Sequence, residues 1–265
     1  MSWLKNRNLY VLLVIYNQNG SDSPACEVLR TRNDVGVLVV DNSTKDYGNE
    51  KYCQKAGFSY LSMHGNQGLS KAYNQGIQYL KQKTNATHVV LLDDDTTLGD
   101  DYFTVLQQAL EQHPDTRIFL PLVKDEVGYL SPCRIEGYAV SRIQSPDELN
   151  ERTITGINSG MALALSIFDD YQYDETYFLD YIDHAFLRDM KRRGESIQVI
   201  GTTLQQQFSG NDHSNYRATL TRFALFKRDF RLFCSDTGTG RLYAQWYLMI
   251  RRIRLFLSAH LRRRK

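Results

Sequence analysis

The sequence predicts an α/β protein whose mainly parallel sheet is flanked by helices, followed by a C-terminal helical extension. Over the first 123 residues, short apolar runs alternate with helical patterns, and such alternation is typical of a parallel sheet covered on both faces. Three of the runs end in polar residues, as strands at a ligand-binding edge do. The pattern then loosens. We therefore expect a main domain over residues 1–210 and a helical extension over residues 211–265.

Composition supports a globular fold. The chain has 265 residues, 42% of them hydrophobic, and a formal net charge of +2, which excludes a disordered or fibrous protein and argues against a strongly basic nucleic-acid binder. The four cysteines have no zinc-ligand spacing, so we expect reduced cytosolic thiols. The first apolar run is too short to span a membrane, and no cleavage site follows it. The sequence therefore predicts a cytoplasmic protein.

The expected strands are short apolar runs of four to eight residues. They are Leu9–Tyr16, Val35–Asp41, Phe58–Leu61, His88–Asp93 and Arg117–Val123. One helix face is expected between the third and fourth runs, because apolar residues recur there at helical spacing. Its members are Leu69, Ala72, Tyr73, Gly76, Ile77 and Leu80. Asp100 is placed to cap a further helix that stops before Pro114.

The second half of the main domain is less regular. Residues 124–157 are expected to be irregular with some short strands, before the polar turn Asn158-Ser159-Gly160 and the apolar run Met161–Phe168. A helix is expected from about Asp180 to Arg193, with Gly194 as its stop.

The acidic run Asp93-Asp94-Asp95 is the strongest local signal for chemistry. Three successive carboxylates after a buried strand repel one another, and a divalent cation, Mg²⁺ or Mn²⁺, would offset that repulsion. The alternative is a solvated loop. Its position at the carboxyl edge of the sheet favours the metal site.

Two further segments indicate a nucleotide. Asp41-Asn42-Ser43 follows a strand, where a carboxylate accepts hydrogen bonds from a ribose or a base; an Asx-turn is the alternative. Gly68 allows close backbone approach at a helix start, where N–H groups favour phosphate, and Lys71 adds a positive charge. Gly76 inside the helix indicates tight packing, since glycine there costs about 1 kcal/mol.

A late acidic pair completes the set. Asp180 and Asp183 are three residues apart and are expected to share a face in the first turn of a helix, where one could serve as a general base. The alternative is capping of the helix N-terminus.

Taken in order, these segments resemble glycosyltransferase family 2 enzymes with a GT-A fold, and most closely the bacterial rhamnosyltransferase-like and galactofuranosyltransferase-like branch. The similarity covers roughly residues 9–210. The matching segments are Val14-Ile15-Tyr16-Asn17, Asp41-Asn42-Ser43, Asn66-Gln67-Gly68 with Asn74-Gln75-Gly76, Asp93-Asp94-Asp95 (the DxD motif) and Phe178-Leu179-Asp180-Tyr181-Ile182-Asp183.

The resemblance implies inverting transfer of a sugar, with rhamnose or a galactose form expected, from a UDP- or dTDP-linked donor to a polysaccharide or lipid-linked glycan. Asp183 would be the catalytic base, and Asp93 and Asp95 would hold Mg²⁺ or Mn²⁺. The residues implied to bind the donor are Tyr16, Asn17, Asp41, Asn66, Gly68, Lys71, Asn74 and Asp94. Those implied to bind the acceptor are Asn158, Ser159, Gly160 and Asp180.

One position departs from the family pattern. Such enzymes often carry a metal-binding histidine after the last core strand, where this chain has Gln207; the nearest histidine is His213. Either His213 takes that role or the metal is held with less help.

The tail is strongly basic. Residues 237–265 contain eight basic residues and no acidic one, which leaves a formal charge of −6 on residues 1–236. Apolar residues gather on one face of the expected tail helix: Leu242, Trp246, Met249, Ile250, Ile253, Phe256 and Leu257. Such a helix suits an anionic membrane surface, which would place the protein at the inner face of the cell membrane. The alternatives are packing on the main domain or contact with a second copy in a homodimer; no nucleic-acid-binding module accompanies the charge.

Two other functions stay open from the residues alone. Leu91–Thr97 also fits the strand end of haloacid-dehalogenase-like phosphohydrolases, in which Asp93 would be the nucleophile. The chain could also be a non-catalytic protein that binds sugar nucleotides, with Gln207 as the lesion.

Overall fold

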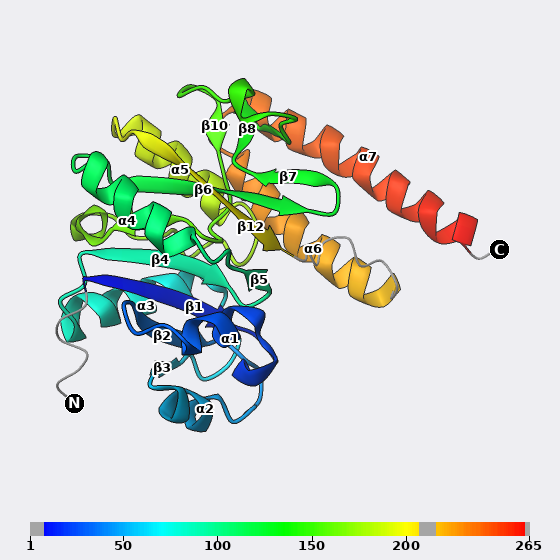
Figure 1. The fold of residues 1–265 in the computed structure, drawn as a ribbon. Coiled ribbons are helices and arrows are strands. Elements are labelled where there is room, and N and C mark those ends of the chain that lie inside the picture. The colour runs from blue at the N-terminus through cyan, green and yellow to red at the C-terminus, as the bar shows by residue number, and fades with distance from the viewer. Residues whose placement is uncertain (1–7, 207–215, 263–265) are drawn as a thin grey trace.

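The structure is a computed structural model that describes residues 8–206 and 216–262. In this part of the chain, nine strands form one sheet in the order β3-β2-β1-β4-β11-β6-β12-β5, with β7 paired to β6 (Figure 1). The strands are β1 Leu9–Ile15, β2 Gly36–Asp41, β3 Ser59–Ser62, β4 His88–Asp93, β5 Thr96–Thr97, β6 Ile118–Asp125, β7 Gly128–Ser131, β11 Ala162–Ala164 and β12 Ile197–Gln206.

The first four strands form the parallel half of the sheet, which confirms the α/β fold class. All five strands expected from the apolar runs are present, and none of their ends differs by more than two residues from the expected one. Parallel pairing sets Ile15 beside Asp41 and Val14 beside Asp93. The polar residues that follow these strands therefore meet at one edge.

The other half of the sheet is mixed. β11 runs antiparallel to both β4 and β6, whereas β12 runs parallel to β6. The stretch expected to be irregular also forms a small antiparallel sheet of β8 Cys133–Glu136, β9 Ala139–Ser141 and β10 Ile154–Thr155. These strands are short enough that no periodicity marked them individually.

Helices cover both faces of the main sheet. They are α1 Pro24–Arg30, α2 Asn49–Ala56, α3 Leu69–Lys83, α4 Tyr102–Gln112, α5 Ile182–Arg192, α6 Tyr216–Phe233 and α7 Gly238–Arg262. Buried residues of α1, α2 and α4 join one core cluster, and those of α3, α5, α6 and α7 join the other. The C-terminal helices therefore pack on the same face as α3.

The expected face of α3 is confirmed. Ala72, Tyr73, Ile77 and Leu80 are buried in the core, and Leu69 packs against it. Gly76 lies directly over the sheet: a Cβ added there would come within 2.5 Å of Leu12 Cδ1 and 3.0 Å of Val40 Cγ2. The tight packing that Gly76 indicated is therefore present.

Two helix starts differ from expectation. α4 begins at Tyr102 after Asp101, and no side chain caps it, so the capping role expected for Asp100 is wrong. The Asp101 carboxylate instead accepts a hydrogen bond from Thr202 Oγ1 (2.7 Å). α5 begins at Ile182 after Tyr181, whose φ is +64°. Gly194, with a φ of +84°, ends that helix region as expected.

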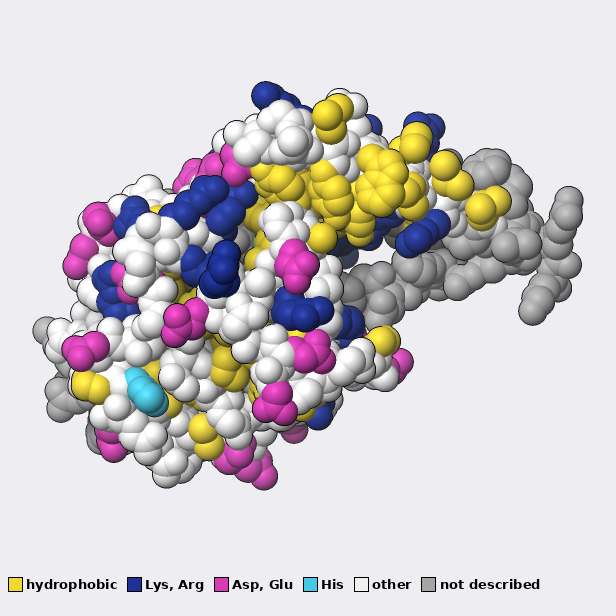
Figure 2. All heavy atoms as spheres, turned by 90° about the horizontal axis from the view of Figure 1, so that it is seen from above, with side chains coloured by type: hydrophobic (Ala, Val, Ile, Leu, Met, Phe, Trp, Pro, Cys, Tyr) yellow, Lys and Arg dark blue, Asp and Glu magenta, His cyan; other side chains and the backbone are white. Residues whose placement is uncertain are grey.

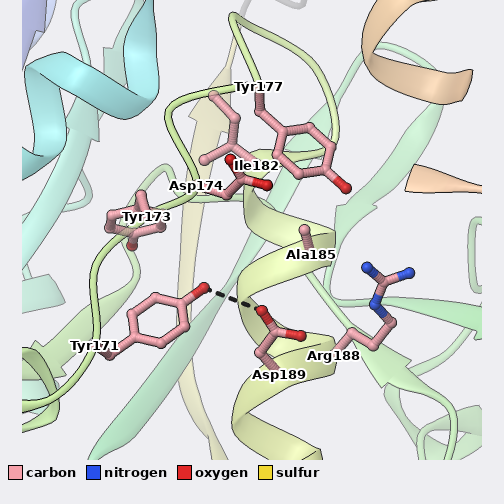
Figure 3. Close-up of a pocket in the computed structure, with 8 residues that line it drawn as sticks. All are labelled: Tyr171, Tyr173, Asp174, Tyr177, Ile182, Ala185, Arg188 and Asp189. Atoms are coloured by element: carbon pink, nitrogen blue, oxygen red, sulfur yellow. Dashed lines mark hydrogen bonds between the residues drawn. The ribbon is translucent and has the colours of Figure 1, made fainter. Parts of the chain in front are cut away.

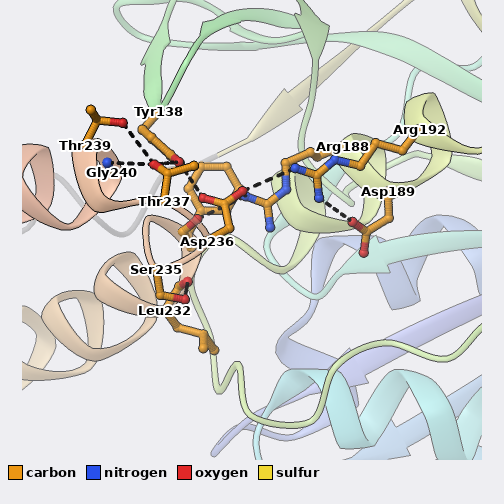
Figure 4. A network of polar contacts seen from close by, with 11 residues as sticks. Tyr138, Arg188, Asp189, Arg192, Leu232, Ser235, Asp236, Thr237, Thr239 and Gly240 are labelled. Carbon is orange, nitrogen blue, oxygen red and sulfur yellow. Dashed lines mark hydrogen bonds and ion pairs between the residues drawn. The ribbon is translucent and has the colours of Figure 1, made fainter.

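A polar network fixes the corner between α6 and α7 to the main domain (Figure 4). Tyr138 and Arg192 both bond to Asp236, at the corner. Tyr138 also contacts Thr237 Oγ1, which in turn accepts from Gly240 N in the first turn of α7 (2.9 Å). This network sets the direction in which α7 leaves the corner.

The close approach of α3 to the sheet leads to a test. We expect Gly76→Val to lower the free energy of unfolding by about 2 kcal/mol, because the added atoms overpack against Leu12 and Val40. Gly201→Val is the matched control, since a Cβ at Gly201 meets nothing within 4 Å. Denaturant unfolding of both variants measures the difference, and equal stability would contradict the packing argument.

Candidate active site

The site is built where the carboxyl ends of β1, β2 and β4 meet. Tyr16 and Asn17 follow β1, Asp41 ends β2, and Asp93 ends β4. Tyr16 is 48% exposed and donates its backbone N–H to Asp94 Oδ2 (3.2 Å). This is the edge at which α/β sheets bind ligands.

Asp41 holds the turn after β2. Its carboxylate accepts hydrogen bonds from Ser43 N (3.0 Å), Asn49 Nδ2 (2.9 Å) and Tyr60 Oη (3.2 Å), so the Asx-turn offered as an alternative is present. Asn17 joins the same turn through Thr44 N (2.9 Å). Asp41 is only 7% exposed, and its contact with a nucleotide stays a prediction.

A second turn lies against the first. Asn42 donates to Asn66 Oδ1 (3.2 Å), which also accepts from Gly68 N (3.1 Å). Gly68 has a φ of +90°, and a Cβ there would come within 2.8 Å of the Phe178 ring. Leu69 N, at the start of α3, donates to Phe178 O (2.7 Å). One of the N–H groups expected to bind phosphate is therefore already bonded within the protein.

The two other donor residues expected on α3 differ in their contacts. Lys71 lies half-buried on the first turn. Asn74 is already bonded through both ends of its amide, to Tyr173 N and Tyr173 O (each 2.9 Å). Asn74 therefore holds the segment around Tyr173, and donor binding by Asn74 stays a prediction.

The acidic run at the end of β4 is the centre of the site. Gln206, the last residue of β12, donates from Nε2 to Asp93 Oδ2 (3.0 Å) and Asp95 Oδ1 (3.2 Å). Sequence analysis missed Gln206, one position before the expected Gln207. Both Gln207 and His213 lie outside the described residues, so the third metal ligand stays a prediction.

Burial makes these carboxylates hard to ionise. Burial, with the charges of Asp95 and Asp94, raises the pKa of Asp93 to about 7. Burial also raises the pKa of Asp94 to about 6 and raises the pKa of Asp95. An apolar surrounding disfavours charge, so this cluster would be stabilised by a positive ligand.

The turn Asn158-Ser159-Gly160, which is expected to bind the acceptor, is hydrogen-bonded to the acidic run and to the strand that precedes it. Ser159 Oγ lies 2.6 Å from Thr96 Oγ1 and accepts from Asp93 N (3.4 Å). Gly160 N donates to Leu91 O (2.8 Å). Both residues are buried. Asn158 Oδ1 is also buried, and among the described residues it has no hydrogen-bond partner.

Asp183 lies in the first turn of α5 with 18% of its side chain exposed. Its charge is the smallest of the causes that raise the pKa of Asp93, so the two carboxylates lie within range of electrostatic interaction. His184 Nε2 is 3.9 Å from Asp183 Oδ1, and Thr155 Oγ1 lies 2.8 Å from His184 Nδ1. A carboxylate in this position can accept a proton from a bound hydroxyl.

Asp180 does not share the first turn of α5 with Asp183, which corrects the expected pairing: the left-handed backbone at Tyr181 places it outside the helix. Its carboxylate instead forms a two-bond ion pair with Arg222 of α6. Acceptor binding by Asp180 stays a prediction, and it would have to occur beside this ion pair.

Asp229 of α6 holds the loop that leads to Asp183. This fully buried carboxylate accepts from three successive backbone N–H groups, those of Phe178 (3.2 Å), Leu179 (2.8 Å) and Asp180 (2.9 Å). Sequence analysis missed Asp229, because an aspartate inside an amphipathic helix carries no pattern of its own.

A small cavity lies between α5 and the segment before it (Figure 3). Its volume is about 70 Å³, enough for a few water molecules and too small for a nucleotide sugar. The lining residues are Tyr171, Tyr173, Asp174, Tyr177, Ile182, Ala185, Arg188 and Asp189. None of the carboxylates at the end of β4 lines it, so it is separate from the site.

Comparison with known proteins matches this geometry to a family. The family model for glycosyl transferase family 2 matches residues 15–164, more than half of the chain and the part that carries the sheet edge and the acidic run. The chain belongs to glycosyl transferase family 2. It is therefore a glycosyltransferase, and the phosphohydrolase alternative, with Asp93 as nucleophile, is wrong.

A relative similar in sequence agrees with this assignment. The glycosyltransferase is 25% identical over 204 residues to the dTDP-rhamnosyl transferase RfbF of Shigella flexneri, covering 74% of this chain and 67% of RfbF. The branch expected from the motifs is thereby confirmed.

Solved structures confirm the GT-A fold. The mannosyltransferase PcManGT of Pyrobaculum calidifontis, in complex with GDP-Man and Mn²⁺, superposes with a TM-score of 0.58 at 12% identity, covering 91% of this chain and 69% of PcManGT. S. aureus TarS 1–349 in complex with UDP gives a TM-score of 0.54 at 17% identity, with 91% and 69% covered.

The raised pKa of Asp93 has a measurable consequence. Its carboxyl has a pKa near 3.8 in the unfolded chain and about 7 in the folded one, so the folded state binds more protons between those values. Stability therefore rises as the pH falls from 8 through 7 toward 4.

In metal-free protein, we expect Asp93→Asn to raise the free energy of unfolding at pH 8 by on the order of 2 kcal/mol and to flatten this pH dependence. Urea unfolding with a chelator at pH 5 and pH 8 measures it, with Asp170→Asn, an exposed ion-pair residue, as control. An equal gain at both pH values would contradict the assignment.

Proposed function

We propose that this glycosyltransferase is a metal-dependent, inverting enzyme that transfers rhamnose or a galactose form from a UDP- or dTDP-sugar to a polysaccharide or lipid-linked glycan. The observation that supports it most is the acidic run of Asp93, Asp94 and Asp95 at the carboxyl edge of the sheet, beside the separate carboxylate Asp183. The acidic run would hold a metal ion that binds the diphosphate, and Asp183 would accept a proton.

The donor would lie along the edge formed by the ends of β1, β2 and β4. The relative named as a dTDP-rhamnosyl transferase supports a dTDP-linked rhamnose. Solved structures of this fold hold UDP, UDP-GlcNAc or GDP-Man, which supports a nucleotide-linked sugar as the donor. Asp41, Asn66 and Gly68 form the two bonded turns that would contact the nucleotide.

The carboxylates fit a hard divalent cation. Oxygen ligands suit Mg²⁺ and Mn²⁺, and Asp93 and Asp95 share only the amide of Gln206, whose Oε1 is buried without a partner among the described residues. In the described chain, no group of three or more His, Cys, Asp or Glu side chains forms a complete metal site. Such an ion keeps substrate phosphates among its ligands, so Asp93 and Asp95 would supply part of its coordination, with His213 or Gln207 as the proposed further protein ligand.

The residues of the site would then have separate roles in the reaction. Asp183 would accept the proton of the acceptor hydroxyl as its oxygen attacks the anomeric carbon, and the bond from that carbon to the diphosphate would break on the opposite face. A bound divalent cation would neutralise charge growing on the leaving diphosphate. Asn158, whose side-chain oxygen is buried without a partner among the described residues, would accept a hydrogen bond from a hydroxyl of the acceptor.

A lipid-linked acceptor would be presented at a membrane, and we place the enzyme at the cytoplasmic face. The relative acts, by its name, in rhamnosyl transfer, and α7 combines arginines with exposed apolar residues.

A thermal-shift screen of nucleotide sugars with Mg²⁺ or Mn²⁺ tests the donor, and no stabilisation by any dTDP- or UDP-sugar would contradict the proposal.

The base assignment predicts a separation of binding from turnover. We expect Asp183→Asn to lower kcat about 10²- to 10⁴-fold and to leave donor affinity within about twofold, because the donor edge is formed by other residues. Calorimetry and a transfer assay measure the two quantities, with Asp115→Asn as the exposed control. Turnover like that of the unsubstituted enzyme would exclude Asp183 as the base.

The metal assignment predicts a change that depends on the ion. We expect Asp95→Ala to weaken donor binding in Mn²⁺ about tenfold or more, and to change donor binding in chelator little. Isothermal titration of the donor in both conditions measures this. An unchanged affinity in Mn²⁺ would remove Asp95 from the metal site.

A further inference from the structure

An exposed apolar stripe runs along α7. It consists of Leu242, Trp246, Met249, Ile253 and Leu257, whose side chains are between 50% and 67% exposed. Figure 2 shows hydrophobic side chains gathered along one projecting edge, with Lys and Arg side chains beside them. Large apolar patches of this kind mark interaction surfaces. In the described chain, no helix is long and apolar enough to cross a membrane.

The opposite face of α7 is already used. Ala244 and Leu248 are buried in the core that α3 and α6 share, and Arg251 lies over the Phe226 ring at 3.7 Å. The Tyr247 ring packs against that of Phe230 in a tilted arrangement, with 4.9 Å between ring centroids. Leu248 fell outside the face expected from the sequence, and the structure explains why: α7 has two apolar faces. One holds the helix to the protein, and the other points away.

Arginines lie on both sides of the stripe. With 3.6 residues per turn, Arg241 and Arg252 fall on one flank and Arg254 on the other, and all three are exposed. Residues 237–265 contain no aspartate or glutamate. Two copies of α7 packed through their stripes would therefore bring arginines together without an acidic partner on either helix, which is unfavourable. An anionic surface would pair with them instead.

We propose that the stripe of α7 docks the enzyme on an anionic lipid bilayer, with the helix lying in the interface. The apolar side chains would enter the acyl boundary, while the flanking arginines reach the phosphate groups. This deepens the proposed location at the membrane by naming the surface, and it does not depend on which sugar is transferred. The corner network around Asp236 fixes the stripe outward from the main domain.

Vesicle binding by the full chain tests the proposal. The probes are vesicles of phosphatidylcholine alone and vesicles in which about one lipid in four is phosphatidylglycerol. We expect binding to the anionic vesicles only, reduced about tenfold or more by Trp246→Gln with Met249→Gln. The triple change Arg241→Gln, Arg252→Gln and Arg254→Gln should cost about fivefold for each arginine.

Val127→Gln is the matched control, because Val127 is a 72% exposed apolar residue in the turn between β6 and β7 and is not part of the stripe on α7. It should bind vesicles as the unsubstituted chain does. Equal vesicle binding by the stripe variant would overturn the proposal. So would a dimer in sedimentation equilibrium that the stripe variant converts to monomer without any vesicle binding, since the stripe would then be an interface between copies. Donor-induced thermal stabilisation, measured on every variant, reports separately on the transferase site.

Discussion

The site depends on the partial burial of three adjacent carboxylates at the end of β4. Asp93, Asp94 and Asp95 repel one another, and burial makes the repulsion more costly. Neutral groups donate to these carboxylate oxygens, namely the amide of Gln206 and the backbone N–H of Tyr16. The Ser159 hydroxyl accepts from the backbone N–H of Asp93. The neutral donors orient the oxygens but do not neutralise them. The chain is thus organised to hold a negative cluster ready for a positive ligand, at a cost in its own stability.

The sequence predicted β1, β2, β3, β4 and β6 because each lies in a short apolar run. It did not predict β5 or β12, which have no such run. The α3 face was equally clear, since its apolar residues recur at helical spacing and the structure buries them. The small antiparallel sheet was not individually predictable, because strands of two to four residues are too short to show a period.

Within the site, residues that follow strands could be found from the sequence, and residues that arrive from distant elements could not. Asp41 and Asp93 could be predicted because each ends a strand that is recognisable in the sequence. Gln206 and Asp229 act through contacts with residues more than 45 positions away, and nothing local marks them. Asp180 was misplaced because the left-handed backbone at Tyr181 breaks the helical spacing.

The hydrogen bonds from the loop before Asp183 to Asp229 limit how members of the family can be divided or recombined. The family model ends at residue 164, yet the loop before Asp183 is anchored by α6, far downstream. The C-terminal helices are therefore not an exchangeable module. A chimera that took them from a relative would lose the partner of three backbone N–H groups unless that relative supplied an acid at the same place. During evolution, substitutions in these helices and in the loop before Asp183 must therefore occur in a coordinated way.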